Sequence, residues 1–462
     1  MSVALLPAVD QLTLLRAGKI SAAELAQEHI RRIERLNPVL NAIVDFDADR
    51  VRRQAAREIA GELSGLPLTV KSSIAVSDQR CEIGSLLHRG RVAHHDAVAV
   101  ARLKEAGAVI LGTTNCPEFL MAYESDNLLY GRTCNPWSLD HTAGGSSGGE
   151  AAAIAAGLSA GGLGSDSGGS VREPAHFSGI CSLKPTSGRI PAEGHMPPCV
   201  GPFSTLGAIG PLARTIPDVD LLFRVASGSS SSVNAGQPLV PYRNVSLREA
   251  KQVTIGWFED DGLTPVTAET RTAMQNAVRT LEKSGFHLRP FRPESLEAAR
   301  RLWHIFFVQC GAMFYEPTIA GRREDLSSTF RGFLELAAAE LPLTPASLLN
   351  AWAESDLVRA RLLAEMEQCP ILLLPVSSTP AFRHGEREWM IEDQQVKYLD
   401  AMRYMQWFNL LGSPAAVVPV GSSNEGLPIG LQIAGRPNDD ELVLAIAKVL
   451  DSEFGYRVPP LH

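Results

Sequence analysis

The chain has 462 residues, with 43 Lys and Arg against 51 Asp and Glu, so its formal charge is −8. An acidic chain without a stripe of basic residues lacks the electrostatic footprint of a nucleic-acid-binding protein. Hydrophobic residues make up 45% and charged residues 20% of the sequence, which is typical of a globular protein with a large core and excludes general disorder.

The sequence predicts neither a membrane segment nor a signal peptide. The uncharged run between Glu150 and Asp166 is shorter than the ~20 residues that cross a bilayer, and the N-terminus reaches Asp10 without a basic segment. Seven cysteines, an odd number without a CxxC pair, indicate reduced thiols, so a cytoplasmic location is expected. The histidines and cysteines also lack the spacing of metal ligands, so no metal site is expected.

The first part of the chain is predicted to be helical. Ser21 and Glu24 have the spacing of a capping box, and an apolar stripe with helical period follows them. Pro38 is expected to end this helix, because proline lacks the N–H that a helix interior needs. A second helical pattern covers residues 47–63.

Strand and helix patterns alternate further along the chain. The predicted strands cover 66–70, 108–111, 253–257, 371–375 and 415–419, and the predicted helices cover 96–107 and 267–284. Residues 295–369 are predicted to be mostly helical. The stretch from 131 to 210 is rich in Gly and Ser, and residues 227–238 are expected to form a surface loop.

This alternation predicts an α/β fold in which helices cover both faces of a mixed sheet, giving a three-layer α/β/α arrangement. We expect one domain over residues 1–462. Within it, we distinguish a helical N-terminal part (1–65), a central section (66–225) and a second α/β section (226–462).

Two glycine–serine clusters carry the candidate chemistry. They cover residues 144–150 and 164–172, and they place Ser146 and Ser170 24 residues apart with an Ala-rich helix between them. Either cluster alone is more typical of a turn or a linker, and neither has the spacing of a phosphate-binding loop. Their recurrence around a helix, together with Lys71 directly after a predicted strand, indicates a functional site.

The two clusters resemble the core of the amidase signature family. Further segments that fit the family are 65–71, 112–115, 135–137, 183–186, 412–415 and 426–432. The resemblance covers most of the chain and becomes thinner between about 225 and 400. It implies that residues 66–225 form a catalytic core and that residues 226–462 shape a substrate pocket. The fold and activity that it implies are those of Ser–cis-Ser–Lys amidohydrolases, among them general amidases, aryl acylamidases and urethanases.

The resemblance implies a catalytic triad without histidine. Ser170 matches the nucleophile, Ser146 the bridging serine behind a cis peptide bond, and Lys71 the base. A lysine can serve as a base where burial lowers its pKa, and it activates a serine that is otherwise a poor nucleophile. The positions that match the family's oxyanion hole are Ser167, Gly168, Gly169 and Ser170.

Several neighbours are expected to support these residues. Asp166 and Arg172 are predicted to form an ion pair that fixes the nucleophile loop, and Ser147 is a supporting hydroxyl. A helix is expected to begin at Val171, with its positive end towards the developing oxyanion. Glu150 at a helix start needs only the helix dipole as an explanation.

Two positions depart from the common family pattern. Ser72 stands where many relatives have an acidic residue, and Ala143 stands where many have proline. Neither belongs to the implied triad, but the first affects how Lys71 is held.

The resemblance implies an acyl transfer from a C–N bond to Ser170, followed by hydrolysis, without a cofactor. Aryl or hydrophobic amides are the expected substrates, and N-aryl carbamates (urethanes) also fit. The candidate pocket residues are Met121, Tyr130, Trp137, Arg189 and Phe408, and the loop 189–203 could form a lid. Late methionine and aromatic residues at helical spacing more often belong to a core.

Two alternatives stay open. One is the A-type subunit of a glutamine-hydrolysing amidotransferase, which is disfavoured because residues 204–210 lack that subunit's Ser-Leu-Asp-Gln-type stretch. The other is a non-catalytic binding protein on the same fold. The expected partner is a small-molecule amide or carbamate rather than nucleic acid or membrane, and the chain is expected to be a monomer or a homodimer.

Overall fold

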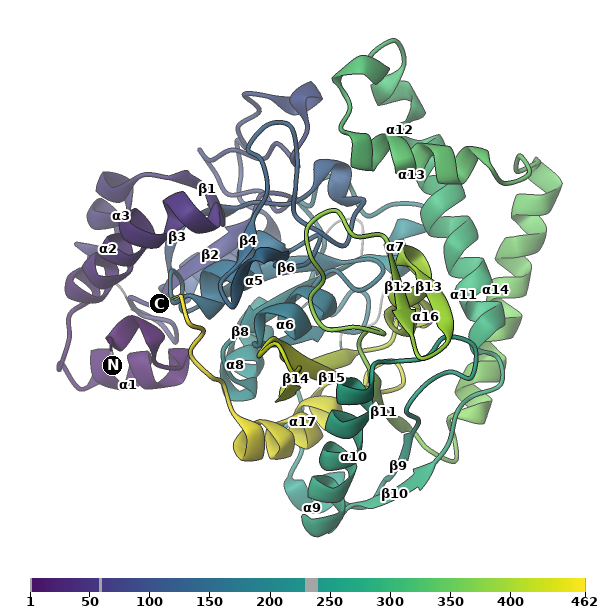
Figure 1. Cartoon of the computed structure of the whole chain (residues 1–462). Coiled ribbons are helices and arrows are strands. Elements are labelled where there is room, and N and C mark those ends of the chain that lie inside the picture. The colour runs from purple at the N-terminus through teal and green to yellow at the C-terminus, as the bar shows by residue number, and fades with distance from the viewer. Residues whose placement is uncertain (1, 58–59, 229–239, 462) are drawn as a thin grey trace.

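The structure is a computed structural model that describes residues 2–57, 60–228 and 240–461. Its centre is one 11-stranded mixed sheet with the strand order β1-β3-β2-β6-β8-β7-β14-β15-β11-β9-β10 (Figure 1). The strands are β1 (Ile43–Phe46), β2 (Pro67–Lys71), β3 (Val109–Thr114), β6 (Gly161–Asp166), β7 (Cys181–Lys184), β8 (Ala208–Ala213), β9 (Thr254–Trp257), β10 (His287–Pro290), β11 (Ile371–Pro375), β14 (Ala415–Ser422) and β15 (Pro428–Ala434). Strand β2 runs parallel to both neighbours, β3 and β6, whereas β6 and β8 are antiparallel.

One face of the sheet is covered by helices that share a single apolar core with it. These helices are α1 (Ala8–Arg16), α4 (Val98–Glu105), α8 (Ile216–Ala226), α10 (Ala268–Lys283) and α17 (Asp440–Phe454). Leu68 and Val70 of β2 belong to this core. Because side chains alternate along a strand, Thr69 and Lys71 face the opposite layer.

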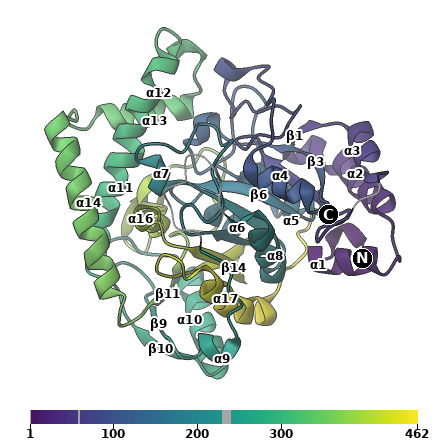
Figure 2. The same cartoon turned by 180° about the vertical axis from the view of Figure 1, so that it is seen from behind.

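The opposite layer contains the two short helices that follow the glycine–serine clusters. Its helices are α2 (Ala22–Leu40), α3 (Ala48–Ala55), α5 (Gly148–Ala155), α6 (Arg172–Ser178), α11 (Leu296–His304) and α16 (Arg403–Leu411). Helices α5 and α6 lie against the central strands (Figure 2). The predicted three-layer α/β fold is therefore confirmed.

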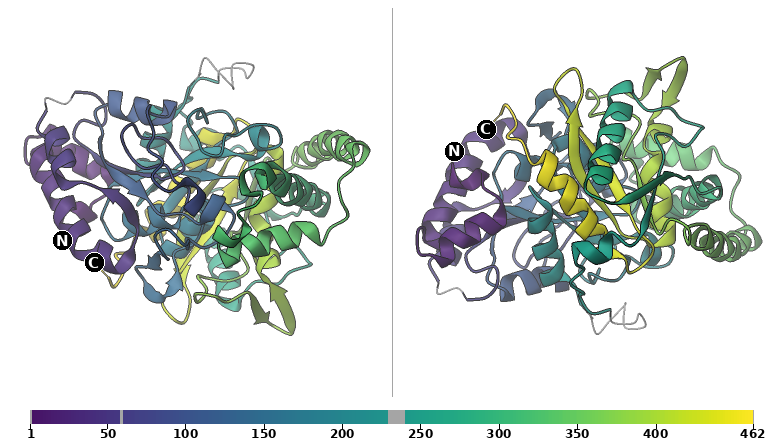
Figure 3. Two further views of the ribbon diagram at one scale, coloured as in Figure 1. Left: turned by 90° about the horizontal axis from the view of Figure 1, so that it is seen from above. Right: turned by 90° about the horizontal axis from the view of Figure 1, so that it is seen from below.

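A group of helices forms the edge of the molecule farthest from the N-terminal helices, as Figure 3 shows. A π-helical turn (Ile305–Gln309) connects α11 to α12 (Cys310–Ile319), and α13 (Ser328–Ala338) and α14 (Pro345–Glu365) follow. The remaining short elements are η1 (Val3–Leu5), η2 (Leu86–His88), η3 (Glu118–Leu120), α7 (Phe203–Leu206), α9 (Leu247–Ala250), η5 (Arg323–Asp325), α15 (Tyr398–Ala401), β4 (Cys134–Asn135), β5 (Ser138–Thr142), β12 (Glu388–Ile391) and β13 (Gln394–Lys397). Across the described ranges, no helix combines the length and apolar character that crossing a membrane requires.

The structure corrects two predicted helix ends. Helix α2 has the predicted Ser21–Glu24 capping box but continues through Pro38 to Leu40, where Asn41 adopts a left-handed conformation. The pattern over 47–63 forms a helix only from Ala48 to Ala55. Gly61, with φ +125, then packs so closely on the end of α4 that a Cβ would lie 2.3 Å from the Ala106 carbonyl oxygen.

The region between the two serines is also more regular than its composition suggested. Its first half is the predicted Ala-rich helix, α5, but its second half is strand β6, buried along its whole length. Glycines leave room there for other groups: a Cβ on Gly162 would lie 2.0 Å from Glu150 Oε1. The predicted loop at 227–238 lies outside the described residues from position 229 onwards.

Candidate active site

Lys71 ends strand β2 in the interior of the molecule, beside the first glycine–serine cluster. Its side chain has no solvent exposure. Nζ donates hydrogen bonds to Ser146 Oγ at 2.6 Å and to Ser165 Oγ at 3.1 Å. Burial lowers the pKa of Lys71 to about 8, although the nearby Cys116, Asp166 and Glu150 act in the opposite direction. The neutral amine that a base requires is therefore accessible near neutral pH.

Ser146 lies in a tight turn at the start of α5. The Gly145–Ser146 peptide bond is cis, as the family resemblance implies. The turn packs against the backbone around Glu124, where a Cβ on Gly145 would lie 2.4 Å from the Glu124 nitrogen. Next to it, Ser147 Oγ contacts the backbone of Ser165 and so connects the turn to β6.

Ser170 follows β6 in the turn before α6. The Ser147 N–H donates to the Ser170 carbonyl at 3.2 Å, which joins the two clusters directly. Ser170 Oγ and the N–H groups of Ser167, Gly168 and Ser170 have no hydrogen-bond partner within residues 2–57, 60–228 and 240–461. These three N–H groups are free to bind an oxyanion.

The fourth expected donor is already occupied. The Gly169 N–H donates to Asp166 Oδ1 at 2.7 Å, and the Val171 N–H donates to Asp166 Oδ2 at 3.1 Å. The carboxylate of Asp166 therefore lies beside the start of α6, which begins at Arg172, one residue after the predicted start. The carboxylate is near enough to bind these N–H groups because β6 ends directly below the turn.

Asp166 and Arg172 form a buried two-point ion pair. Arg172 Nη2 lies 3.0 Å from Asp166 Oδ1, and Arg172 Nε lies 3.1 Å from Asp166 Oδ2. Burial alone would raise the pKa of Asp166, but the guanidinium of Arg172 brings it below its ordinary value. Because Asp166 also binds Gly169 and Val171, this pair fixes the nucleophile turn.

Two aromatic side chains also bind the turn that holds Ser170, through its backbone carbonyl groups. Trp303 Nε1 donates to the Ser167 carbonyl at 2.8 Å, and the Tyr123 hydroxyl donates to the Gly168 carbonyl at 2.8 Å. In a trans peptide the C=O and the following N–H point in opposite directions. Trp303 therefore directs the Gly168 N–H away from its own ring.

Glu150 has a larger role in the packing than a helix dipole alone would require. It is fully buried, and its two oxygens accept hydrogen bonds from Thr69 Oγ1 at 2.5 Å and Thr114 Oγ1 at 2.8 Å. Burial raises the pKa of Glu150 to about 8. Thr69 shares a face of β2 with Lys71, and Thr114 pairs with Lys71 across the β2–β3 register, so Glu150 holds the two strands around the lysine.

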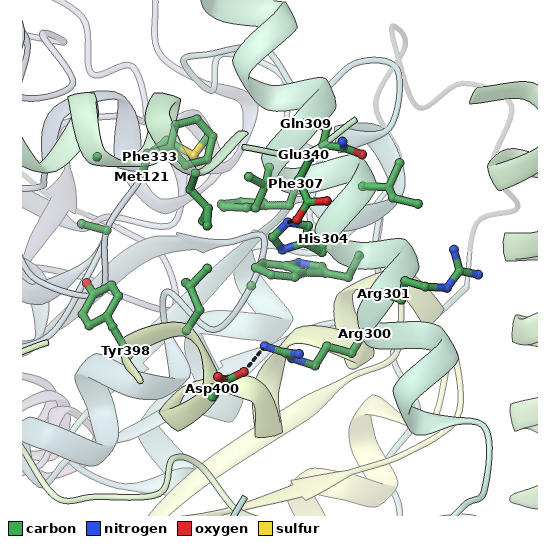
Figure 4. A pocket seen from close by; sticks show the side chains of 18 of the residues that line it. Met121, Arg300, Arg301, His304, Phe307, Gln309, Phe333, Glu340, Tyr398 and Asp400 are labelled. Atoms are coloured by element: carbon green, nitrogen blue, oxygen red, sulfur yellow. Dashed lines mark hydrogen bonds and ion pairs between the residues drawn. The ribbon is translucent and has the colours of Figure 1, made fainter. Parts of the chain in front are cut away.

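A large cavity of about 1230 Å³ opens beside Ser170 (Figure 4). Its inner wall is apolar and aromatic: Trp303 and Phe307 stack at 4.7 Å, and Met121 and Phe333 lie beside them. The π-helical turn supplies part of this wall, a geometry that is frequent at functional sites. Charged residues line the outer part in pairs, such as Arg300 with Asp400 at 2.6 Å.

A second cavity, of about 30 Å³, is also lined by Ser170. Ser146, Ser165, Ser167 and Ser170 line it with hydroxyl groups. Five residues of the segment 189–203 also line it, namely His195, Pro197, Pro198, Cys199 and Phe203. Within the described chain, no three His, Cys, Asp or Glu side chains are arranged to hold a metal ion.

Comparison with known proteins agrees with this geometry. The family model described as Amidase matches residues 24–444. The chain belongs to the amidase family. It is 32% identical to the A-type subunit of the glutamyl-tRNA(Gln) amidotransferase from Roseiflexus sp. (strain RS-1), over 98% of this chain and 99% of the relative. It is 33% identical to an indoleacetamide hydrolase from Bradyrhizobium diazoefficiens, over 97% of this chain and 86% of the relative.

Solved structures of amidase-family enzymes superpose on nearly the whole chain. A 6-aminohexanoate cyclic dimer hydrolase complexed with substrate has a TM-score of 0.87 and 26% identity, with 99% of each chain covered. A bacterial aryl acylamidase of the amidase signature family has a TM-score of 0.81 and 26% identity, with 97% of this chain and 96% of that chain covered. The fold is therefore that of the amidase signature enzymes.

Of the five expected pocket residues, the structure places only Met121 in the described cavities. The Tyr130 hydroxyl donates to Glu82, and Trp137 Nε1 donates to the Ser178 carbonyl at 2.9 Å. Arg189 is paired with Asp440 and Glu441, and Phe408 belongs to the core next to Trp407. The aromatic or charged character of these four residues is typical of a pocket, but in the structure their side chains contact other parts of the protein.

Three residues that contact the site were not predicted from the sequence, because the fold rather than a local pattern brings them there. Ser165 lies within the second cluster, yet only the parallel pairing of β6 with β2 brings it to Lys71. Trp303 and Tyr123 are far from Ser170 in the chain, and no local pattern sets them apart from core aromatic residues.

Proposed function

We propose that the chain is a serine amidase in which Ser170 attacks the carbonyl carbon of an amide. The observation that carries the proposal is the buried Lys71, 2.6 Å from Ser146 Oγ and with a pKa lowered to about 8. In this reaction Lys71 accepts the proton of Ser170 through Ser146. The free N–H groups of Ser167, Gly168 and Ser170 bind the negative oxygen that develops, the kind of interaction worth ~10²–10³ in rate per donor.

The large cavity supports an aryl or hydrophobic group next to the scissile bond. Stacked aromatic side chains such as Trp303 and Phe307 bury flat apolar groups well. Amides and N-aryl carbamates both place such a group next to a carbonyl C–N bond. The amide is the proposed substrate because the named hydrolases among the relatives act on amides, and the carbamate is the alternative that the same assay measures.

Glutamine hydrolysis is the second candidate, because the chain is 32% identical to the A-type subunit of an amidotransferase over nearly its full length. The cavity favours a neutral substrate instead. Three arginines that line it are already paired: Arg300 with Asp400, Arg301 with Glu354 and Arg387 with Glu124. An amino-acid substrate would have to compete with these carboxylates for its charged groups.

The test measures ammonia and aniline release from an aryl carboxamide, an anilide, the matching N-aryl carbamate and free glutamine. Ser170→Ala is expected to lower kcat for the accepted amide by about 10⁴-fold or more, whereas the exposed Ser204→Ala is expected to leave it unchanged. Robust turnover of glutamine alone would replace the proposal by the amidotransferase function. Unchanged turnover in Ser170→Ala would overturn the assigned nucleophile, and no turnover at all would favour a binding protein.

A further inference from the structure

The free N–H groups of Ser167, Gly168 and Ser170 each follow a trans peptide bond. In a trans peptide group the C=O and the N–H point in opposite directions. A donor that binds the carbonyl oxygen therefore sets the direction in which the N–H points. The groups that bind these three carbonyls decide how well the three N–H groups converge on one oxygen atom.

Two of the three carbonyls are bound by groups that belong to the general packing of the turn. The Asp166 carbonyl accepts a hydrogen bond from Asn409 Nδ2 at 3.3 Å, and this nitrogen also contacts Asp166 Oδ1 and the Leu206 carbonyl, both at 2.9 Å. The Gly169 carbonyl accepts a hydrogen bond from the backbone N–H of Glu173 at 2.8 Å. A substitution cannot remove either contact without changing other parts of the turn.

The third carbonyl, that of Ser167, is bound by a side chain with a single donor. Trp303 Nε1 donates to it at 2.8 Å, and an indole ring has only this one N–H. The edge of the same ring packs on the next residue, because a Cβ on Gly168 would lie 2.6 Å from Trp303 Cζ2. Trp303 thus holds the Ser167–Gly168 peptide group by a hydrogen bond and by direct contact.

The ring of Trp303 is itself fixed in place. It is only 1% exposed, and it stacks on Phe307 with ring centroids 4.7 Å apart. The two residues are four positions apart where α11 passes into the π-helical turn, and residues at this spacing lie on one side of a helix. Because packed interiors leave little room for a ring to turn, the indole N–H keeps its direction towards Ser167.

We infer that Trp303 is a positioning residue for the oxyanion site, which acts through the Ser167–Gly168 peptide group. Its indole N–H holds the Ser167 carbonyl on one side, so that the Gly168 N–H points to the opposite side. The inference rests on the proposed function, because an oxyanion forms only if Ser170 attacks a carbonyl carbon. A ring of the same shape without the N–H would fill the same space but would leave the Gly168 N–H poorly directed.

The test replaces Trp303 in two ways and measures turnover of phenylacetamide and phenylacetanilide. Trp303→Phe removes the N–H and one ring, whereas replacement of Trp303 by β-(3-benzothienyl)alanine keeps two fused rings and has sulfur in place of the N–H. Both are expected to lower kcat about 10- to 100-fold, somewhat less than the loss of a whole oxyanion donor, and to change KM by less than about threefold.

A second measurement follows the oxyanion directly. Benzyl trifluoromethyl ketone forms a hemiketal with a serine hydroxyl, and the oxygen of this hemiketal carries the negative charge. Its affinity is expected to fall in both Trp303 variants by about the same factor as kcat/KM, because transition-state mimics depend on the same donors. A ring that only filled space would not move the two quantities together.

Two other variants serve as controls. Trp352 is 42% exposed on α14 and lines neither cavity, so Trp352→Phe is expected to leave kcat and KM unchanged. Tyr123→Phe removes the hydrogen bond to the Gly168 carbonyl, but the N–H of that peptide group, on Gly169, is already bound to Asp166. Tyr123→Phe is therefore expected to lower kcat by less than about threefold.

The outcomes distinguish a failure of the inference from a failure of the proposed function. Wild-type kcat and ketone affinity in the benzothienyl variant would overturn the role of Trp303 and leave the amidase function in place. A lower kcat with unchanged ketone affinity would also overturn it, because the oxyanion donors would then be intact. No turnover of either substrate by the wild-type protein would overturn the proposed function itself. The benzothienyl variant decides the question even where Trp303→Phe fails to fold.

Discussion

Replacing Lys71 by methionine is expected to change the stability of the protein in a pH-dependent way. The pKa of the lysine is 10.5 in an unfolded chain and about 8 in the folded protein, so folding below pH 8 must overcome the cost of burying a charged ammonium. A difference of this size corresponds to about 3 kcal/mol at pH 7 and about 1 kcal/mol at pH 10. The cost is complete below the folded pKa and disappears as the pH rises towards the unfolded one.

Methionine has a similar shape without the charge. It removes this cost, but it also removes the hydrogen bonds from Nζ to Ser146 and Ser165, worth ~1 kcal/mol each at any pH. Lys71→Met is therefore expected to be about 1 kcal/mol more stable than the wild-type protein at pH 7 and about 1 kcal/mol less stable at pH 10. The same variant is expected to lose its amidase activity.

The measurement is equilibrium urea denaturation of both proteins at pH 7 and pH 10, followed by tryptophan fluorescence. Lys19→Met is the matched control, because Lys19 is exposed and its replacement removes no buried charge. Its stability relative to the wild-type protein is expected to be the same at both pH values. If the stability of Lys71→Met relative to the wild-type protein is also the same at pH 7 and pH 10, Lys71 is not a buried lysine whose charge destabilises the folded protein.

Two further predictions concern the groups around Lys71 and Ser170. The kcat/KM for an accepted amide is expected to rise with pH through about 8, as Lys71 loses its proton. Glu150→Gln is expected to move this midpoint only slightly to lower pH, because Glu150, whose pKa is also about 8, carries only part of a negative charge there. A midpoint that moves to higher pH in Glu150→Gln would contradict this. Asp166→Asn is expected to destabilise the protein by ~3–5 kcal/mol in urea denaturation, because Arg172 stays buried without its partner. The double variant Asp166→Asn, Arg172→Met is expected to recover part of that loss, and equal stability of the two variants would contradict the argument.

Much of the fold is predictable from local patterns in this chain. The Ser21–Glu24 capping box identified the start of α2, and the apolar runs at 371–375 and 415–419 identified two central strands. Helix ends were less predictable, because they depend on what packs against them. Pro38 is tolerated close to the end of α2, where Asn41 completes the helix, and α3 ends early because the chain around Gly61 packs against α4.

The candidate site was also predictable only in part. The two glycine–serine clusters and Lys71 were recognisable because close backbone turns leave a dense local pattern of small residues. For Glu150, the sequence indicated only a favourable interaction with the helix dipole, although its side chain accepts hydrogen bonds from a threonine on each of two strands. Trp137 and Phe408 were predicted to line the pocket from their residue type alone. Residue type does not indicate in which direction a side chain points in the folded protein.

The sequence by itself determined the family, the α/β layering and the short segments that hold Lys71, Ser146 and Ser170, because each depends on residues that are neighbours in the chain. Tertiary structure decided which groups meet at those residues. Parallel pairing of β6 with β2 brings Ser165 to Lys71, and α11 brings Trp303 to the nucleophile turn. The two cavities that Ser170 lines arise only when these distant segments pack together, because side chains from widely separated parts of the chain form their walls.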